Sequence, residues 1–462
     1  MMQIHRFEVD LLLKWLNKQG RKPLIIRGAR QVGKSSIVRR IANLSQRTCF
    51  ELNFERYPEH ADFFKSKDPS TILDYLGTYF KQPINPQSSI LFLDEIQATP
   101  KVIEILRYFY EECPELPVIA AGSLLEFVLV EPEFSVPVGR VEYFHLGPIN
   151  FEDFLLAQGE EALLQWIRSV SLQDTIPITI HKRCLELVKQ FWLIGGMPEV
   201  VSHYAEHHDF QEIDNIKQNI LQSYQEDFHK YGRIKQIPLL RRVFKTIPNL
   251  IGQKIKYVKL DSDSKSVQVK ESLDYLNLAK VIHLVYHSHA SGIPLRAQIN
   301  PKIFKAIFLD IGLLCSTLGL SQLSVIHTPN WSWINRGSLA EQFIGQTLFQ
   351  LNPSYQMPEL YYWMREKAQS SAEVDYVWQY ENQIIPIEVK AGKTGHLKSL
   401  HYFIQEKRWP YGVRFNTDRP SLLIEKAKLP DHEPFSYKLL SLPFYLAGQL
   451  NRFIIMTSDK NT

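Results

Sequence analysis

Residues 24–36 read Leu-Ile-Ile-Arg-Gly-Ala-Arg-Gln-Val-Gly-Lys-Ser-Ser, and this stretch decides the fold. Its first three residues are typical of a buried β-strand, and the pattern GxxxxGK[ST] follows from Gly28 to Ser35. Helical spacing continues over Ser36–Leu44. A strand, a glycine-rich loop and a helix in this order predict a loop whose backbone N–H groups bind phosphate. The alternative is a glycine-rich turn that precedes a helix by chance.

The residue types in this loop are those that phosphate binding requires. Gly28 and Gly33 let the backbone curl so that its amides face the phosphates, and the helix N-terminus adds its dipole. Lys34 is expected to reach the β- and γ-phosphates of ATP, and the Ser35 hydroxyl is expected to ligate Mg²⁺. The predicted nucleotide contacts are Gly28, Ala29, Arg30, Gln31, Val32, Gly33, Lys34, Ser35 and Ser36.

A second motif stands at the end of another apolar strand. Residues 89–95 read Ser-Ile-Leu-Phe-Leu-Asp-Glu, so two carboxylates follow the strand. Asp94 is predicted to lie beside the glycine-rich loop and to hold Mg²⁺, often through water. Glu95 is predicted to polarise the attacking water as a general base. A pair of acids that only caps the next helix is the alternative.

Two further residues complete the predicted site. Ser123 follows the apolar run Val118–Ala121 and would bond the γ-phosphate or the attacking water; capping the next helix is an equal alternative. Arg140 precedes the next strand and would stabilise transition-state charge as an arginine finger, in its own subunit or in a neighbouring one. A surface salt bridge is the competing interpretation of Arg140.

Short apolar runs alternate with amphipathic stretches through the first 160 residues, which predicts an α/β domain with a parallel sheet. The predicted strands are Pro23–Arg27, Cys49–Asn53, Ile90–Leu93, Val118–Ala121 and Glu142–Leu146. Helical periodicity then dominates as far as Lys230. Further on, a helical run at Ser264–Ala279 and a strand at Val281–Tyr286 are compatible with a winged helix.

The composition is that of an ordinary folded protein, with 45% hydrophobic and 22% charged residues and a net charge of +4. This charge permits a local nucleic-acid patch without arguing for one. The four cysteines lie far apart with no CxxC pair, which argues against a structural zinc site and against a disulfide framework. The chain lacks both a signal-peptide core and an apolar stretch of about 20 residues, so a cytoplasmic location is expected.

Acidic residues and a lysine gather in a strand pattern near the C-terminus. Residues 384–390 are predicted to form a strand on which Glu388 and Lys390 share a face. Asp375 would come close across a short turn, and Glu341 would add a carboxylate from the preceding helix. Carboxylates with one lysine bind Mg²⁺ or Mn²⁺ and activate water, so the pattern predicts a second metal site. An ordinary solvated ion pair is the alternative.

The order of these motifs resembles the AAA+ superfamily P-loop ATPases of bacteria and archaea that carry an uncharacterised C-terminal domain. The matching stretches, within roughly residues 21–403, are 28–35, 93–97, 121–123, 139–140, 146–149, 195–200, 308–314, 336–341, 373–375 and 387–392. The resemblance implies a C-terminal domain of the PD-(D/E)XK nuclease type, with Glu341, Asp375, Glu388 and Lys390 at its site positions. It also makes Ser123 the first sensor, whereas no clear second-sensor arginine is present.

The resemblance and the changes of rhythm predict an α/β fold class with five segments. They are a P-loop AAA+ ATPase core with a parallel sheet (1–160), a helical lid (161–232), a winged-helix-like domain (233–327), an α/β PD-(D/E)XK nuclease-like domain (328–430) and a C-terminal extension (431–462). The family's biological role is poorly defined, so the resemblance supplies no substrate.

Three functions are compatible with this pattern. The first is Mg²⁺-dependent ATP hydrolysis coupled to action on or binding of nucleic acid, DNA rather than RNA, through the nuclease-like module. The second is an ATP-controlled switch with slow turnover, whose C-terminal domain is an inactive binding platform. The third is a protein-interaction module, on which the lysines at 254, 256, 259, 265 and 270 are only surface. A protein partner and a homo-oligomer are allowed; a membrane is not expected.

Overall fold

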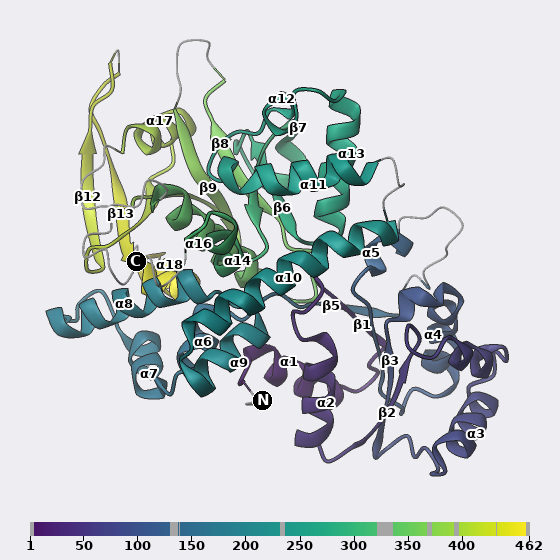
Figure 1. Cartoon of the computed structure of the whole chain (residues 1–462). Helices are drawn as coiled ribbons and strands as arrows, with labels where there is room; N and C mark the ends of the chain where they lie inside the picture. Colours follow the sequence, from purple (N-terminus) through teal and green to yellow (C-terminus); the bar gives the residue numbers. More distant parts are fainter. Residues whose placement is uncertain are drawn as a thin grey trace.

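The computed structural model describes residues 4–129, 137, 139–231, 236–320, 336–366, 372–391, 397–430 and 432–458. Within them the chain forms two β-sheets with helices packed around and between them (Figure 1). Gly392 of the last matching stretch lies outside the described residues. No helix in the described ranges combines the length and the hydropathy of a membrane span.

The strands are β1 (Leu24–Arg27), β2 (Thr48–Asn53), β3 (Ser89–Asp94), β4 (Val118–Ala121), β5 (Glu142–His145), β6 (Ile282–Ser288), β7 (Ile299–Phe308), β8 (Leu360–Met364), β9 (Glu373–Tyr380), β10 (Gln383–Val389), β11 (Tyr411–Asn416), β12 (Ser421–Ala427) and β13 (Phe435–Pro443). The helices before residue 232 are α1 (Phe7–Leu16), α2 (Lys34–Leu44), α3 (Pro69–Phe80), α4 (Pro100–Glu112), α5 (Leu125–Leu129), α6 (Phe151–Ala157), α7 (Glu161–Ser169), α8 (Ile178–Ile194), α9 (Pro198–His207) and α10 (Phe210–Tyr231). The later helices are α11 (Ile237–Thr246), α12 (Tyr257–Leu260), α13 (Ser266–Leu278), α14 (Ile311–Thr317), α16 (Arg336–Leu351), α17 (Lys398–Lys407) and α18 (Leu450–Ser458). Short 3₁₀ helices are η1 (Pro58–Phe64), η2 (Ile96–Ala98), η4 (Ile247–Leu250), η5 (Leu295–Gln298) and η6 (Phe444–Gln449).

The first sheet has five parallel strands in the described residues, in the order β2-β3-β4-β1-β5. Its strands are apolar on both faces because helices cover both. On β1, Leu24 and Ile26 pack with α1 and α2, whereas Ile25 packs with α3 and α4. The predicted parallel α/β sheet is confirmed. Since all strands run the same way, the glycine-rich loop after β1 and Asp94 at the end of β3 lie at the same edge.

Helices α6–α10 follow the first sheet, where a helical segment was predicted. The longest described helix, α10, has 22 residues and contacts α9, α11 and α14. In Figure 1 it crosses the molecule between the first sheet and the C-terminal half. Helix α10 therefore contacts elements of both halves of the chain.

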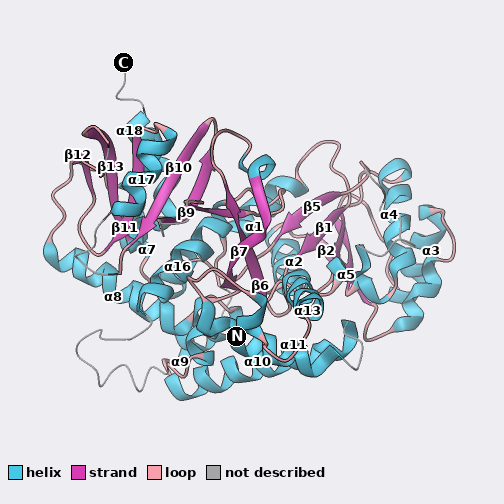
Figure 2. Ribbon diagram, turned by 90° about the horizontal axis from the view of Figure 1, so that it is seen from above, coloured by secondary structure: helices cyan, strands magenta, loops and turns pink. Residues whose placement is uncertain are grey.

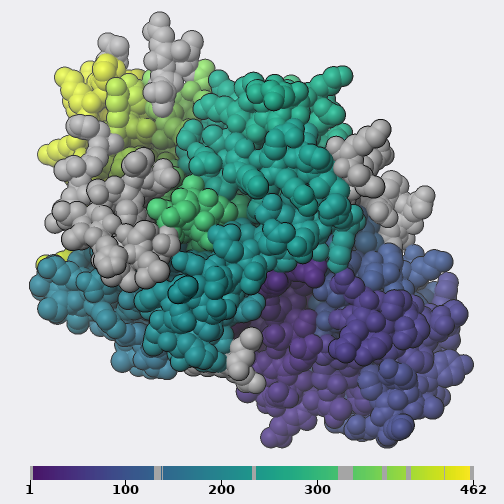
Figure 3. Space-filling view, viewed as in Figure 1, coloured from purple at the N-terminus to yellow at the C-terminus, as the bar shows by residue number. Residues whose placement is uncertain are grey.

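The second sheet has eight strands in the described residues, in the order β12-β13-β11-β10-β9-β8-β6-β7. Seen from above, it occupies the left and centre of the molecule, and the first sheet lies on the right (Figure 2). In the space-filling view, the purple and blue residues of the first sheet and its helices form a separate lobe at the lower right (Figure 3).

Two strand pairings cross boundaries of the predicted division. Strands β6 and β7 belong to the segment 233–327, predicted as a separate winged-helix-like domain, yet Val285 of β6 pairs in parallel with Leu360 of β8. Strand β13 belongs to the predicted extension 431–462, yet it pairs in parallel with β11 inside the sheet. Pairing joins strands that are distant in sequence through backbone hydrogen bonds, so local periodicity does not reveal it.

Candidate functional site

The glycine-rich loop is tightly enclosed by backbone. A Cβ atom on Gly28 would lie 2.2 Å from the Leu146 carbonyl oxygen, so only glycine fits. Gly33 has a φ of 91°, in the left-handed region that favours glycine, and it directly precedes α2. The loop therefore places its amides at the N-terminus of α2, where the helix dipole favours an anion.

Lys34 lies inside this loop. Its Nζ donates hydrogen bonds to the carbonyl oxygens of Gly28 (3.0 Å) and Ala29 (2.7 Å). Burial lowers the pKa of Lys34 to about 8, although the nearby carboxylates of Glu95 and Asp94 oppose this shift. The lysine is thus held within the loop by backbone carbonyls, next to the predicted phosphate position.

Ser35 and Asp94 meet across the edge of the sheet. The Ser35 hydroxyl lies 3.1 Å and 3.0 Å from the two Asp94 oxygens, and Asn53 Nδ2 donates to Asp94 at 3.1 Å. Burial, reinforced by the charge of Glu95, raises the pKa of Asp94 to about 6. A hydroxyl beside a carboxylate is a donor set that Mg²⁺ takes in proteins.

Glu95 is held by donors from the next strand and turn. Its Oε2 accepts from Gln97 Nε2 (2.7 Å), the Ser123 hydroxyl (3.1 Å) and the Ser123 backbone N–H (3.3 Å). Burial raises the pKa of Glu95, but these hydrogen bonds and the charge of Lys34 outweigh it, so the pKa lies below the ordinary value. Ser123 contacts Glu95, and Gln97 is a partner that the sequence did not single out.

The C-terminal carboxylates also come together, around a lysine that the sequence analysis missed. Lys305 of β7 is buried, and its Nζ contacts Glu341 Oε1 at 2.8 Å and a carboxylate oxygen of Glu373. Glu388 is paired with Lys390, as two residues on one strand face. The sequence signal for Lys305 is a lone lysine inside the apolar strand stretch 303–308.

This carboxylate cluster is defined as Glu341, Glu373, Asp375 and Glu388, with Lys305 and Lys390. Burial and the charges of Glu388 and Glu341 raise the pKa of Asp375 well above its ordinary value. Burial lowers the pKa of Lys305, but the surrounding carboxylates outweigh it and raise this pKa well above the ordinary range. Glu388 Oε2 is buried without a hydrogen-bond partner, which leaves one acceptor open to a cation.

Comparison with known families locates three matches along the chain. Residues 20–155 match the family described as AAA domain. With the glycine-rich loop, Lys34, Ser35 and Asp94 in the geometry above, one assignment follows. Residues 20–155 form an AAA-type P-loop ATPase domain. Residues 185–324 and 336–426 match two domains of unknown function, DUF8612 and DUF4143. No curated protein matches the chain.

Three solved structures are similar to parts of this chain. A Walker-type ATPase of Pyrococcus abyssi is 15% identical, covers 68% of this chain and 96% of its own, and has a TM-score of 0.43. The RuvB Holliday junction branch migration motor of Thermotoga maritima is 14% identical, covers 60% of this chain and 89% of its own, and has a TM-score of 0.28. The Pif1 helicase of Candida albicans is 16% identical, covers 40% of this chain and 48% of its own, and has a TM-score of 0.23. All three TM-scores are below 0.5, so these likenesses say nothing about substrate or partner.

The ATPase domain is contacted by α10 at its phosphate loop. Arg30 Nη1 donates to both Asp227 oxygens at 2.8 and 2.7 Å, and the Tyr224 hydroxyl donates to the Arg30 carbonyl at 2.8 Å. Here the loop supplies the arginine and α10 supplies the acid. No local pattern marks Asp227 or Tyr224, because their role depends on how α10 crosses the loop.

Arg140 lies at the surface of the ATPase domain. Its Nε donates to Glu111 of α4 at 2.8 Å, and its side chain is exposed. This is the surface salt bridge that the sequence allowed as an alternative. Within one chain Arg140 therefore has a partner away from Lys34 and Ser35, and a role across a subunit boundary stays a prediction.

Proposed function

We propose that this protein binds and hydrolyses ATP with Mg²⁺ at the ATPase domain. The observation that carries the proposal is the contact of the Ser35 hydroxyl with Asp94, at 3.0 Å, beside a loop whose backbone excludes any side chain at Gly28. The donor set and the glycine-only backbone fit a triphosphate with its metal. Bound Mg²⁺ would neutralise charge on the phosphates.

Residues of this chain would bind the phosphates, hold the metal and accept the proton from water. Lys34, now bonded to two carbonyls of the loop, would donate to the phosphates instead. Ser35 and Asp94 would hold the metal. Glu95, whose pKa is held below the ordinary value, stays ionised at neutral pH and would accept a proton from the attacking water. Adjacent acids with opposite pKa shifts suit such separate roles.

The test is ATP turnover by variants of the full chain. Lys34→Ala is expected to reduce kcat/KM at least about 100-fold, since it removes a charge that acts on the phosphates. Glu95→Gln is expected to bind ATP, measured by calorimetry, but not to turn it over. Lys101→Ala, on the exposed start of α4, is the matched control and should match the wild type. Unchanged turnover in Lys34→Ala would overturn the proposal.

For the C-terminal half, we propose a nuclease-like module that acts on or binds nucleic acid. The carboxylate cluster supports it, since Glu388 Oε2 lacks a hydrogen-bond partner, and burial together with the charges of Glu388 and Glu341 raises the pKa of Asp375. Mg²⁺ or Mn²⁺ fits this oxygen donor set, and Asp375 and Glu388 would hold it. Lys390 would orient or deprotonate the nucleophile.

The buried ammonium of Lys305 favours the second candidate, a switch with an inactive binding platform. It pairs with both Glu341 and Glu373, so these two carboxylates have a cationic partner without a metal. Under this proposal, ATP binding changes the arrangement of α10, and the C-terminal half binds a partner without cutting it.

One set of assays separates the two candidates. Plasmid, single-stranded DNA and RNA are incubated with the full chain in Mg²⁺ or Mn²⁺. A nuclease cuts at least one of them, and Asp375→Asn abolishes the cutting. A platform leaves all three intact and binds a partner with an affinity that changes with ATP. Cutting that survives in Asp375→Asn would contradict the nuclease proposal, and an affinity independent of ATP would contradict the switch.

The surface around α12 and α13 supports nucleic-acid binding. Its exposed lysines are Lys256, Lys259, Lys265 and Lys270. Lys270 also pairs with Asp274 at 3.3 Å. If these lysines contact phosphates, DNA affinity falls steeply with salt, and charge reversal of Lys256 and Lys259 reduces the slope by roughly one per contact. A flat salt dependence would contradict the contact and favour a protein partner.

A further inference from the structure

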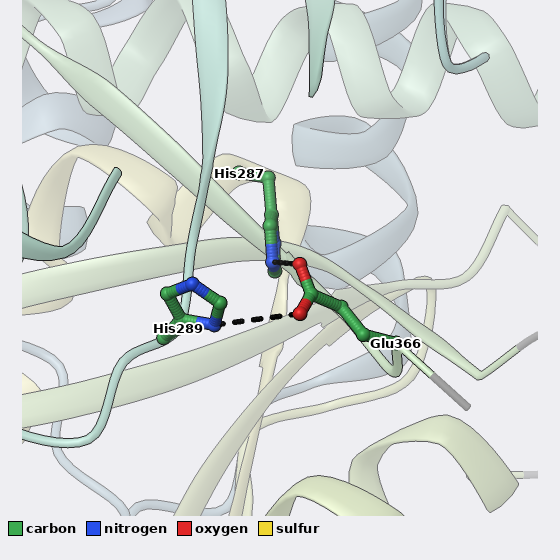
Figure 4. Close-up of side chains that lie close together, drawn as sticks. All are labelled: His287, His289 and Glu366. Atoms are coloured by element: carbon green, nitrogen blue, oxygen red, sulfur yellow. Dashed lines mark ion pairs between the residues drawn. The ribbon is translucent and has the colours of Figure 1, made fainter. Parts of the chain in front are cut away.

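Two histidines and a glutamate meet where β6 and β8 end side by side. His287 lies on β6, His289 follows that strand, and Glu366 follows β8 (Figure 4). Their ligand atoms all lie within 4.8 Å of one another. The three residues come from segments almost 80 positions apart in the sequence, so only the parallel pairing of β6 with β8 brings them together.

The distances within this group are those of a small coordination sphere. His287 Nε2 lies 3.3 Å from Glu366 Oε1, and His289 Nδ1 lies 3.9 Å from Glu366 Oε2. For a tetrahedral ion with bonds of about 2.0–2.1 Å, neighbouring ligand atoms are roughly 3.3–3.4 Å apart. The first distance equals such a separation. The second is longer and ends on the other carboxylate oxygen, so a bound ion would draw the exposed His289 ring closer.

His287 supplies a second, independent observation. Its side chain is fully buried, and its Nε2 has no hydrogen-bond partner although it points at Glu366 (Figure 4). Burial removes the water that would otherwise satisfy this nitrogen, so its polar neighbour is the Glu366 carboxylate, 3.3 Å away. The other nitrogen, Nδ1, faces the backbone of β8, where it accepts from the Met364 N–H at 3.3 Å and the Tyr362 backbone is a further partner of the ring. Metal binding through Nε2 requires the tautomer with the proton on Nδ1, so it would exchange the Met364 contact for donation to a carbonyl of β8.

We infer that His287 Nε2, His289 Nδ1 and the Glu366 carboxylate form a binding site for a divalent transition-metal ion of the Zn²⁺ class. Two imidazoles and one carboxylate select such an ion over Mg²⁺, which prefers oxygen ligands. Three protein ligands leave a fourth position open to water or to a substrate oxygen. Histidines supply the site, so the scattered cysteines, which argued against zinc, do not bear on it.

The site is separate from the carboxylate cluster, but one residue lies between them. The Tyr362 ring is 5.8 Å from the His287 ring and 5.1 Å from Lys305 Nζ. Bound metal would fasten the end of β6 to the end of β8. It would thereby stiffen the strand that carries Tyr362 over the cluster.

Among the described residues, a second pair of histidines with adjacent rings serves as a control. His203 and His207 are one turn apart on α9, and their rings stack at 4.5 Å. They lie in the helical segment and share no strand with His287. Substituting His207 therefore removes this competing pair without touching the inferred site.

The experiment is metal binding by the full, untagged chain. Zn²⁺ affinity and stoichiometry are measured by competition with a chromogenic chelator, and Co²⁺ is used as a spectroscopic probe of coordination. We expect one tightly bound Zn²⁺ and visible Co²⁺ absorption of a four-coordinate site. His289→Ala and Glu366→Gln should each weaken binding at least about tenfold, whereas His207→Ala should not. His289 and Glu366 are 50% and 46% exposed, so both variants are expected to fold.

Two results would overturn the inference. One is the absence of a stoichiometric Zn²⁺ in the wild type. The other is a loss of affinity in His207→Ala with none in His289→Ala. As a second measurement, saturating Zn²⁺ should raise the melting temperature of the wild type and of His207→Ala but not of Glu366→Gln. Equal rises in all three would also contradict it.

Discussion

Asp94 and Glu95 are neighbours in sequence, but their surroundings shift their pKa values in opposite directions. Asp94 accepts from one hydroxyl and one amide and has a pKa of about 6, whereas three donors keep the pKa of Glu95 low. Asp94 is buried at the end of its strand, whereas Glu95 has a left-handed backbone (φ 51°) and its own side chain contacts Ser123. A single backbone angle thus gives adjacent acids different chemistry.

The raised pKa of Asp94 predicts a dependence of stability on pH. Because the folded pKa lies above the unfolded one, the carboxyl favours folding below about pH 4, and this contribution is lost as pH rises through 6. Asp94→Asn cannot ionise, so it should stabilise the nucleotide-free protein at pH 8 by up to about 3 kcal/mol, and less at pH 5. Melting temperatures at both pH values measure this.

Asp68, whose pKa is lowered instead of raised, is the control for the Asp94→Asn comparison. Hydrogen bonds from Ser70 and Thr71 lower the pKa of Asp68 to about 2 at the N-cap of α3. Asp68→Asn should therefore not stabilise the protein at pH 8. A gain in Asp94→Asn that is the same at pH 5 and pH 8 would show that ionisation of Asp94 is not its cause.

Ser123 is predicted to act as a positioning residue through Glu95. Ser123→Ala removes the hydroxyl donor at 3.1 Å, which should raise the pKa of Glu95. We expect ATP affinity to be unchanged, kcat to fall about tenfold, and the acidic limb of the kcat–pH profile to move to higher pH. Ser45→Ala, at the C-terminal end of α2, is the control. A fall in kcat without a shift of the acidic limb would contradict this role.

At the scale of elements, α10 is the connection between the helical segment and the phosphate loop. Asp227 of α10 is buried and binds Arg30 through both oxygens, and Tyr224, one turn earlier, bonds the Arg30 backbone. These contacts fix the backbone that must cradle the phosphates. A movement of α10 would therefore displace Arg30 and the glycine-rich loop. Under the proposed function, this contact would connect the helical segment to the nucleotide without a second-sensor arginine.

Asp227→Asn tests this connection. It leaves Arg30 without its charged partner, and we expect ATP affinity to fall about three- to tenfold and stability to fall by about 1–3 kcal/mol. Glu226→Gln changes the neighbouring, exposed acid of the same helix and is the matched control. Calorimetric titration with ATP and urea unfolding measure the two effects. An unchanged affinity in Asp227→Asn would mean that α10 does not set the loop's geometry.

At the scale of the whole molecule, Asp310 joins the helical segment to the C-terminal half. It is fully buried, accepts from the Gly196 N–H at 2.6 Å and caps α14 through the Leu313 N–H at 3.0 Å. A Cβ on Gly195 would lie 2.2 Å from its carboxylate, and a Cβ on Gly196 would lie 2.0 Å from the Ile149 carbonyl oxygen, which together account for the glycine pair there. Two stretches of the family resemblance, 195–200 and 308–314, are therefore in contact with each other.

Removing this contact should destabilise the protein as a whole. Asp310→Ala leaves two buried N–H groups without an acceptor, and we expect a loss of about 2–4 kcal/mol in the free energy of unfolding. Urea unfolding monitored by tryptophan fluorescence measures it. Asp263→Ala, at an exposed position, is the control and should change stability by less than about 0.5 kcal/mol. Equal effects in the two variants would contradict the structural role of Asp310.

The sequence determined the parts of this protein that local chemistry specifies. The parallel sheet follows from apolar runs of strand length, and the phosphate loop follows from glycine, lysine and serine at fixed spacing between β1 and α2. The strand face shared by Glu388 and Lys390 was also predictable, because side chains alternate along a strand.

Tertiary structure decided what depends on contacts between distant segments. Strand pairing adds β6, β7 and β13 to the C-terminal sheet. It also places Lys305 among the carboxylates and His287 beside Glu366. The physical reason is that periodicity fixes which face of an element is buried, whereas backbone hydrogen bonding and packing between remote elements fix which side chains share that buried space.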